Sequence, residues 1–144
     1  MRHEHTVLVV DDDLQTRSAL AELLRENGLK AQRARNGHEA IRKLRSRKKP
    51  CLILLDLMMP GMTGWEFLEF HRGSRALSSV PLVLVTGWVD TDIAQAKALI
   101  SKPIEPRRLL LRLKRVLGQE RRRGANPERP ARIRAGKGRR RLRK

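Results

Sequence analysis

Residues 51–64 read CLILLDLMMPGMTG, an apolar run that ends at Asp56 and leads into a loop. Five consecutive apolar residues are typical of a central strand in a parallel sheet, because helices cover both faces of such a strand. Pro60, Gly61 and Gly64 mark the loop, and a helical pattern follows it. This region therefore predicts a buried strand with a carboxylate at its carboxyl end.

Short apolar runs and helical patterns alternate on both sides of this strand. The further strands are predicted at Thr6–Val10, Leu29–Ala34, Leu82–Val85 and Leu99–Ser101. The helices are predicted at about Leu14–Asn27, after Asn36-Gly37, at Trp65–Arg72, at Thr91–Ala98 and from Pro106 to Gly118. In the first helix, Arg17 is expected to face water. This order predicts an α/β domain with a five-stranded parallel sheet, in which the polar second strand lies at an edge.

The composition of the chain limits the classes of protein to which it can belong. It has 144 residues, of which 40% are hydrophobic, enough for one domain with a real core. The single cysteine, Cys51, excludes an internal disulfide and a multi-cysteine zinc site. The apolar runs are much shorter than the roughly 20 residues of a membrane-spanning helix. A cytoplasmic protein without a membrane span is expected.

Four of the five predicted strands end in a polar group: Asp11-Asp12, Asp56, Thr86 and Lys102. The carboxyl ends of parallel strands share one edge of the sheet, where ligands bind in open α/β folds. Three carboxylates gathered there repel one another unless a cation neutralises them, and oxygen ligands with room for water suit Mg²⁺. A carboxylate held against Mg²⁺, with a lysine and a hydroxyl beside it, can accept a phosphoryl group.

Ordered motifs carry a resemblance to a known family: VLVVDDD at residues 7–13, LLDLMMPGMTG at 54–64, VTG at 85–87 and SKP at 101–103. Over about residues 5–117 the chain resembles the receiver domain of bacterial two-component response regulators. The resemblance implies a doubly wound, flavodoxin-like fold. It also implies a signalling protein that catalyses only its own aspartyl phosphorylation, and not an enzyme.

Taken position by position, the resemblance implies a phosphoryl acceptor and its metal ligands. Asp56 would receive the phosphoryl group from the phosphohistidine of a histidine kinase or a phosphotransfer protein. Asp12 and Asp56 would bind Mg²⁺ directly, together with the backbone carbonyl of Met58. Asp11 would act largely through water.

The remaining site residues follow from the same resemblance. Thr86 would donate a hydrogen bond to a phosphoryl oxygen, Lys102 would form an ion pair with it, and the Lys102-Pro103 bond would be cis. The sequence also departs from the family in two places. The connection from Thr86 to Lys102 is several residues shorter than usual, which implies a shortened fourth helix. Leu99 stands where the family tends to have an aromatic switch residue, so the relay to that aromatic is not carried over.

The end of the chain has a different composition. Residues 118–144 hold 12 basic and 2 acidic residues, more than half of the net charge of +18. They lack an apolar period, and we expect a disordered basic tail after a receiver domain at residues 5–117. Residues 119–144 would bind a polyanion without reading sequence, which leaves nucleic acid, a membrane surface or an acidic partner as candidates. The alternative is an extension without a selected role.

The sequence as a whole favours a stand-alone response regulator whose output is contact with an unknown partner protein. One alternative is a haloacid-dehalogenase-like phosphatase, in which Asp11 and Asp13 would be the catalytic pair. Another is a nucleic-acid-associated protein that uses the basic tail and keeps the receiver domain as a scaffold. A third is that the aspartates only cap helices and turns, a role we expect of Asp13 for the first helix.

Overall fold

The computed structural model describes residues 5–46, 48–57, 64–87 and 95–125, with side chains up to Gln119. Within these ranges the strands are β1 (Thr6–Val10), β2 (Lys30–Ala34), β3 (Leu52–Asp56), β4 (Leu82–Thr86) and β5 (Ala96–Ser101). The helices are α1 (Leu14–Glu26), α2 (Gly37–Leu44), α3 (Gly64–Gly73) and α4 (Pro106–Ala125). The strands other than β5 begin and end within one residue of their predicted bounds.

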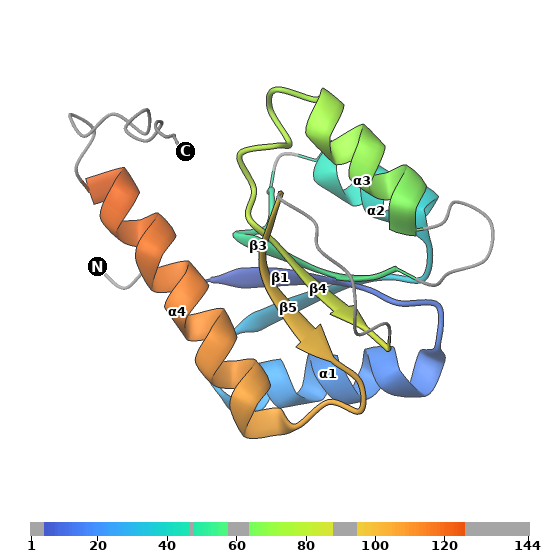
Figure 1. The fold of residues 1–144 in the computed structure, drawn as a ribbon, viewed down its shortest axis with the longest axis vertical. Helices are drawn as coiled ribbons and strands as arrows, with labels where there is room; N and C mark the ends of the chain where they lie inside the picture. Colours follow the sequence, from blue (N-terminus) through green and yellow to red (C-terminus); the bar gives the residue numbers. More distant parts are fainter. Residues whose placement is uncertain (1–4, 47, 58–63, 88–94, 126–144) are drawn as a thin grey trace, which may run out of the picture.

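The strands form one parallel sheet in the order β2-β1-β3-β4-β5. Helices α1 and α4 cover one face of the sheet, and α2 and α3 cover the other (Figure 1). This arrangement confirms the doubly wound, flavodoxin-like fold, with β2 at an edge. The chain reverses its direction across the sheet between β1 and β3, so the crevice at their carboxyl ends is the expected ligand site.

The core consists of two hydrophobic layers, one on each face of the sheet. Along β1, Leu8 and Val10 belong to the layer under α2 and α3, whereas Val7 and Val9 belong to the layer under α1 and α4. All four side chains are at most 1% exposed. Because both faces are covered, the central strands read as unbroken apolar runs in the sequence.

Polar side chains determine where the first two helices begin. The carboxylate of Asp13 accepts the backbone N–H of Thr16 and caps α1, as expected. The side chain of Asn36 accepts the backbone N–H of Glu39 at 2.8 Å and caps α2. Gly28 follows α1 with a φ of 82°, a left-handed conformation that favours glycine.

The start of β5 differs from the prediction. Residues 96–98 were expected at the end of a short helix, but they belong to the strand, and Ala96 and Ala98 pair with Leu82 and Val83. Alanine and lysine favour helices locally, and pairing with β4 overrides this preference. Of the rest of the predicted short helix, Gln95 lies in a turn, and residues 91–94 lie outside the described residues.

The predicted end of the last helix is also wrong. Helix α4 does not stop at Gly118 but continues to Ala125. A glycine inside a helix costs only about 1 kcal/mol relative to alanine, and the glutamine, glutamate and arginines that follow are good helix formers. Residues 118–125, expected in a disordered tail, are therefore helical, and residues 126–144 lie outside the described residues. None of the described helices has the length and apolar character needed to cross a membrane.

A buried histidine connects α3 to the start of β5. His71 is 3% exposed, and its Nε2 lies 2.9 Å from the carbonyl oxygen of Val80. Its Nδ1 lies 3.0 Å from the side-chain nitrogen of Gln95, the residue before β5. Since the amide nitrogen of Gln95 can only donate, Nδ1 is the acceptor and Nε2 donates to Val80. This pair fixes the beginning of β5 against α3.

Candidate metal centre

The strand register gathers the predicted site residues at one edge of the sheet. Asp11 follows β1, Asp56 ends β3, Thr86 ends β4 and Lys102 follows β5. In the parallel pairing, Thr86 lies opposite Ser101, one residue before the lysine. The backbone N–H of Lys102 also donates to the carbonyl of Thr86 at 2.9 Å. Four separate strands therefore contribute to one site.

Three carboxylates form the centre of this site. Asp11, Asp12 and Asp56 each offer one oxygen, and the three oxygens lie within 4.8 Å of one another. Asp11 and Asp56 are buried, whereas Asp12 is exposed. A hard divalent cation such as Mg²⁺ prefers oxygen ligands and keeps several waters, so this partly open set of carboxylates fits it. We call these three residues the aspartate cluster.

Lys102 supplies the opposing charge. Its Nζ lies 3.2 Å from Oδ2 of Asp56 and 3.7 Å from Oδ2 of Asp11. Partial burial disfavours the ammonium form, but the carboxylates of Asp11 and Asp56 outweigh burial and raise the pKa of Lys102. The lysine is therefore charged at neutral pH. The peptide bond that follows it, Lys102-Pro103, is cis, as the resemblance implied.

The surroundings of Asp11 disfavour the charged form of its carboxyl group. Burial raises the pKa of its carboxyl group, and the nearby charge of Asp56 acts in the same direction. The backbone N–H of Asp13, which donates to Oδ1 of Asp11 at 2.9 Å, opposes this rise. One ammonium beside three carboxylates leaves an excess of negative charge that a divalent cation would offset.

Arg17 is a residue of the site that the sequence analysis missed. It was expected to face water, but it is half-buried, and its Nη1 donates to the backbone carbonyl of Asp11 at 2.7 Å. The guanidinium therefore ties the first turn of α1 to the end of β1. Its helical spacing alone could not have revealed a contact with the backbone six residues earlier.

Gly64 allows the chain to pass close beneath the site. A Cβ atom at this position would meet the Cα of Leu57, and would lie 2.7 Å from the carbonyl oxygen of Leu57 and 2.8 Å from that of Asp56. The backbone N–H of Gly64 also donates to the Leu57 carbonyl at 3.0 Å. Only glycine fits between α3 and the end of β3. Met58, whose carbonyl was predicted as a metal ligand, lies outside the described residues.

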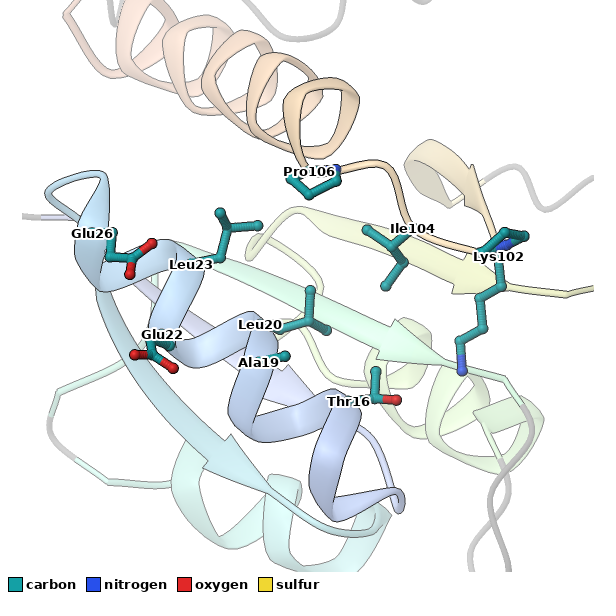
Figure 2. A pocket seen from close by; sticks show the side chains of 10 residues that line it. Thr16, Ala19, Leu20, Glu22, Leu23, Glu26, Lys102, Ile104 and Pro106 are labelled. Atoms are coloured by element: carbon teal, nitrogen blue, oxygen red, sulfur yellow. The ribbon is translucent and has the colours of Figure 1, made fainter.

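A groove opens beside Lys102 on the face of the sheet covered by α1 (Figure 2). It has a volume of about 630 Å³ and lies between α1 and the segment that joins β5 to α4. Ala19, Leu20 and Leu23 line its α1 side, and Ile104 lines the other side. The carboxylates of Glu22 and Glu26 lie along α1, away from Lys102 (Figure 2). The groove is therefore apolar, with a cation at one end and two acids at the other.

A family model described as "Response regulator receiver domain" matches residues 7–114 of the chain. The chain belongs to this family. Receiver domains are signalling modules with an acidic pocket for Mg²⁺, which is the position of the aspartate cluster in this receiver. The match also confirms the resemblance drawn from the ordered motifs.

The curated relatives of this receiver are longer proteins. A CpxR homologue of Haemophilus influenzae, described as a transcriptional regulatory protein, is 36% identical over 84% of this chain and 52% of its own length. The DNA-binding response regulator MtrA of Mycobacterium leprae is 37% identical over 75% of this chain and 49% of its own length. The chain thus spans about half the length of the curated relatives that it matches.

Solved receivers superpose closely on this chain. The chemotaxis protein CheY4 of Vibrio cholerae is 29% identical, with a TM-score of 0.72 over 79% of this chain and 99% of the other. A CheY-like receiver domain protein of Methanospirillum hungatei is 27% identical, with a TM-score of 0.74 over 85% of this chain and 100% of the other.

These findings do not favour the phosphatase alternative. That alternative requires Asp13 to face the reacting group together with Asp11. Asp13 is instead exposed and caps α1, and the hydrogen bond from the hydroxyl of Thr16 lowers the pKa of its carboxyl group. Asp56 takes the place beside Asp11.

Proposed function

We propose that this receiver accepts a phosphoryl group on Asp56 from the phosphohistidine of a histidine kinase or a phosphotransfer protein. An Asp56 carboxylate oxygen would attack phosphorus, a P–O bond would form, and the P–N bond to the donor histidine would break. The observation that carries this proposal is the 3.2 Å contact between Lys102 and Asp56 at the edge of the aspartate cluster. We propose that this reaction takes place in the cytoplasm.

Each remaining residue has a role in positioning charge. Asp11, Asp12 and Asp56, with the carbonyl of Met58, would hold Mg²⁺, which when bound offsets the negative charge on the phosphoryl oxygens. Lys102 would move from its pairing with Asp56 to a phosphoryl oxygen. The hydroxyl of Thr86, buried at the end of β4, would donate to another of these oxygens. The ionic partners of Asp56 therefore become partners of the new phosphoryl group.

The groove beside Lys102 is the proposed docking surface for the donor protein. A donor must bring its phosphohistidine to Asp56, and the groove ends at the lysine that contacts this residue. Its apolar lining suits the apolar stripe of a helix. Glu22 and Glu26 favour a donor helix with lysine or arginine at the far end. Phosphorylation would then shift the receiver between two conformations, and the output would be contact with a partner protein.

The acceptor is tested with acetyl phosphate and Mg²⁺, followed by electrophoresis on a phosphate-retarding gel. We expect the wild-type chain to shift and Asp56→Asn not to shift. Asp13→Asn is the matched control and should shift like wild type, because asparagine also caps helices. Equal labelling of Asp56→Asn and wild type would contradict the proposal. Since small donors do not phosphorylate every receiver, a chain that stays unlabelled is tested again with a histidine kinase.

The docking surface is tested by comparing two donors. Ala19→Arg fills the groove with a bulky cation, so we expect transfer from a histidine kinase to fall at least tenfold, whereas labelling by acetyl phosphate stays unchanged. Ala76→Arg is the matched control, because Ala76 is also an exposed alanine and does not line the groove. Equal losses with both donors, or no loss with either, would exclude the groove.

A further inference from the structure

Helix α4 has one apolar side, and the fold buries it. Leu109, Leu113, Val116 and Leu117 are at most 5% exposed and belong to the hydrophobic layer shared with α1. These positions repeat at intervals of three and four residues, so they lie on one side of the helix. The opposite side of α4 therefore faces solvent.

Every charged residue on the solvent side of α4 is basic as far as Gln119, where the described side chains end. Its charged residues are Arg107, Arg108, Arg112, Lys114 and Arg115, all exposed. We call these five residues the α4 basic face. No carboxylate lies among them, and their helical spacing places them within one continuous arc of the helix surface. The face therefore presents a single sign of charge.

These five cations have no ionic partner among the described residues. Two exposed cations elsewhere in the described residues do have ionic partners: Arg35 pairs with Glu39, and Arg72 pairs with Glu69. The nearest carboxylate in sequence, Glu105, instead accepts the backbone N–H groups of Arg107 and Arg108 at 2.6 and 3.2 Å.

The spacing of the basic residues brings like charges close together. Arg108 and Arg112 are four residues apart, and Arg112 and Arg115 are three apart, so both pairs are neighbours on the helix surface. Such pairs weaken an isolated helix slightly. One of them, Arg112, also donates to the backbone carbonyl of Leu99 at 3.4 Å, which holds its side chain toward β5. An anionic partner would relieve the repulsion.

We propose that the α4 basic face binds the sugar–phosphate backbone of a nucleic-acid duplex without reading its sequence. Arg107 to Arg115 span about 12 Å along the helix axis, a length over which duplex DNA carries about seven negative charges. Arginine, which forms four of the five cations, can bind phosphate through two parallel hydrogen bonds.

Other anionic partners fit this face less well. A membrane-surface helix inserts its apolar side into the lipid, but the apolar side of α4 already packs on the sheet, and Leu111 is the one large apolar residue on the exposed side as far as Gln119. A single-stranded nucleic acid is usually held by aromatic side chains, and α4 has none. This inference does not depend on the phosphorylation of Asp56.

The test is a fluorescence-anisotropy titration of a labelled 30-base-pair DNA duplex of arbitrary sequence at several salt concentrations, with the full chain. The variant Arg107→Gln/Arg108→Gln/Arg115→Gln should weaken binding at least tenfold at low salt. The slope of log affinity against log salt should decrease by about three, because each phosphate contact contributes about 0.9. The corresponding triple lysine variant should bind nearly as well as wild type.

The matched control removes the same charge from the opposite layer of the molecule. Arg42, Lys48 and Lys49 are exposed on and after α2, and their triple glutamine variant should bind within about twofold of wild type. Equal losses in both glutamine variants would show that net charge alone binds DNA, and an unchanged α4 variant would exclude the face. Loss of binding to phosphatidylserine vesicles without loss of binding to DNA would also overturn the proposal, in favour of a membrane. Circular dichroism checks that each variant is folded.

Discussion

The aspartate cluster and the α4 basic face both hold like charges close together, but they differ in what surrounds the charges. Two of the three aspartates, Asp11 and Asp56, are buried. The chain itself provides a cation for them, because Nζ of Lys102 lies 3.2 Å from Oδ2 of Asp56 and 3.7 Å from Oδ2 of Asp11. The five cations of α4 are exposed and have no ionic partner among the described residues. Burial makes an uncompensated charge costly, whereas water screens an exposed one.

The difference indicates how each region selects its ligand. Two carboxylates of the aspartate cluster are buried and contact Lys102, so their positions are set before binding and suit a small cation. The α4 basic face is open and convex, so its ligand is selected by charge alone. Four substitutions test this contrast, in order of decreasing expected effect.

The first tests how tightly the backbone encloses the aspartate cluster. Gly64→Ala would place a Cβ against the backbone of Leu57 and the carbonyl of Asp56, so we expect the free energy of unfolding to fall by about 3 kcal/mol. Urea unfolding measures this change. Gly73→Ala, at the other end of α3 with no atom within 4 Å of the new Cβ, is the control. Similar losses for both variants would contradict the close approach.

The second compares the removal of one lysine from each region. Lys102→Met leaves the carboxylates of Asp11 and Asp56 without their cation, and we expect a loss of about 2 kcal/mol in the presence of EDTA, less than for a fully buried pair. Millimolar Mg²⁺ should restore most of the loss. Lys114→Met, on the α4 basic face, should change stability by less than about 0.5 kcal/mol with or without Mg²⁺. If Mg²⁺ has the same effect on both variants, the aspartate cluster is not its site.

The third, Gly118→Ala, tests whether α4 continues as a regular helix through Gly118. Nothing lies within 4 Å of a Cβ built on Gly118, so Gly118→Ala should raise the free energy of unfolding by about 1 kcal/mol, the usual gain inside a helix. Thermal unfolding followed by circular dichroism measures it. A loss of stability would mean that Gly118 ends the helix.

The fourth uses a carboxylate outside the aspartate cluster, Glu39, as a reference for it. The backbone N–H of Arg35 donates to Glu39 at 2.8 Å and lowers the pKa of this carboxyl group. A lowered pKa contributes stability above the unfolded value of about 4.3, and this contribution is lost as the pH falls through the folded value. Glu39→Gln should therefore cost about 0.5 kcal/mol at pH 7 and nothing near pH 3. A cost that stays constant with pH would contradict the role of the charge.

The parts of this receiver that could be predicted depend on signals local in the sequence. The apolar run before Asp56 predicted β3, and the polar residues after four strands predicted which groups meet at the sheet edge. Parallel strands share their carboxyl ends, so strand order was not needed for this step. The capping role of Asp13 could also be predicted from the sequence, because a cap acts within three residues.

The parts that could not be predicted depend on contacts with distant residues. The alanines at 96 and 98 favour a helix by themselves, and only their pairing with β4 makes them a strand. The contact of Gln95 with His71, 24 residues earlier, leaves no pattern in the sequence. Gly118 predicts a helix end because glycine is common there, but its cost inside a helix is small enough for α4 to continue.

The assembly of the site from separate strands has a consequence for folding. Asp56 and Lys102 are 46 residues apart, and each reaches the sheet edge only after a crossover connection has been completed. Long-range parallel pairing is slow because the entropy of loop closure is lost before the contacts form. No partly folded form in which β5 is unpaired can therefore present the complete set of charges. Divalent-ion binding during refolding would report the pairing of β1 with β3. The contact of Lys102 with Asp56, which phosphoryl transfer also requires, would form only after β5 has joined the sheet.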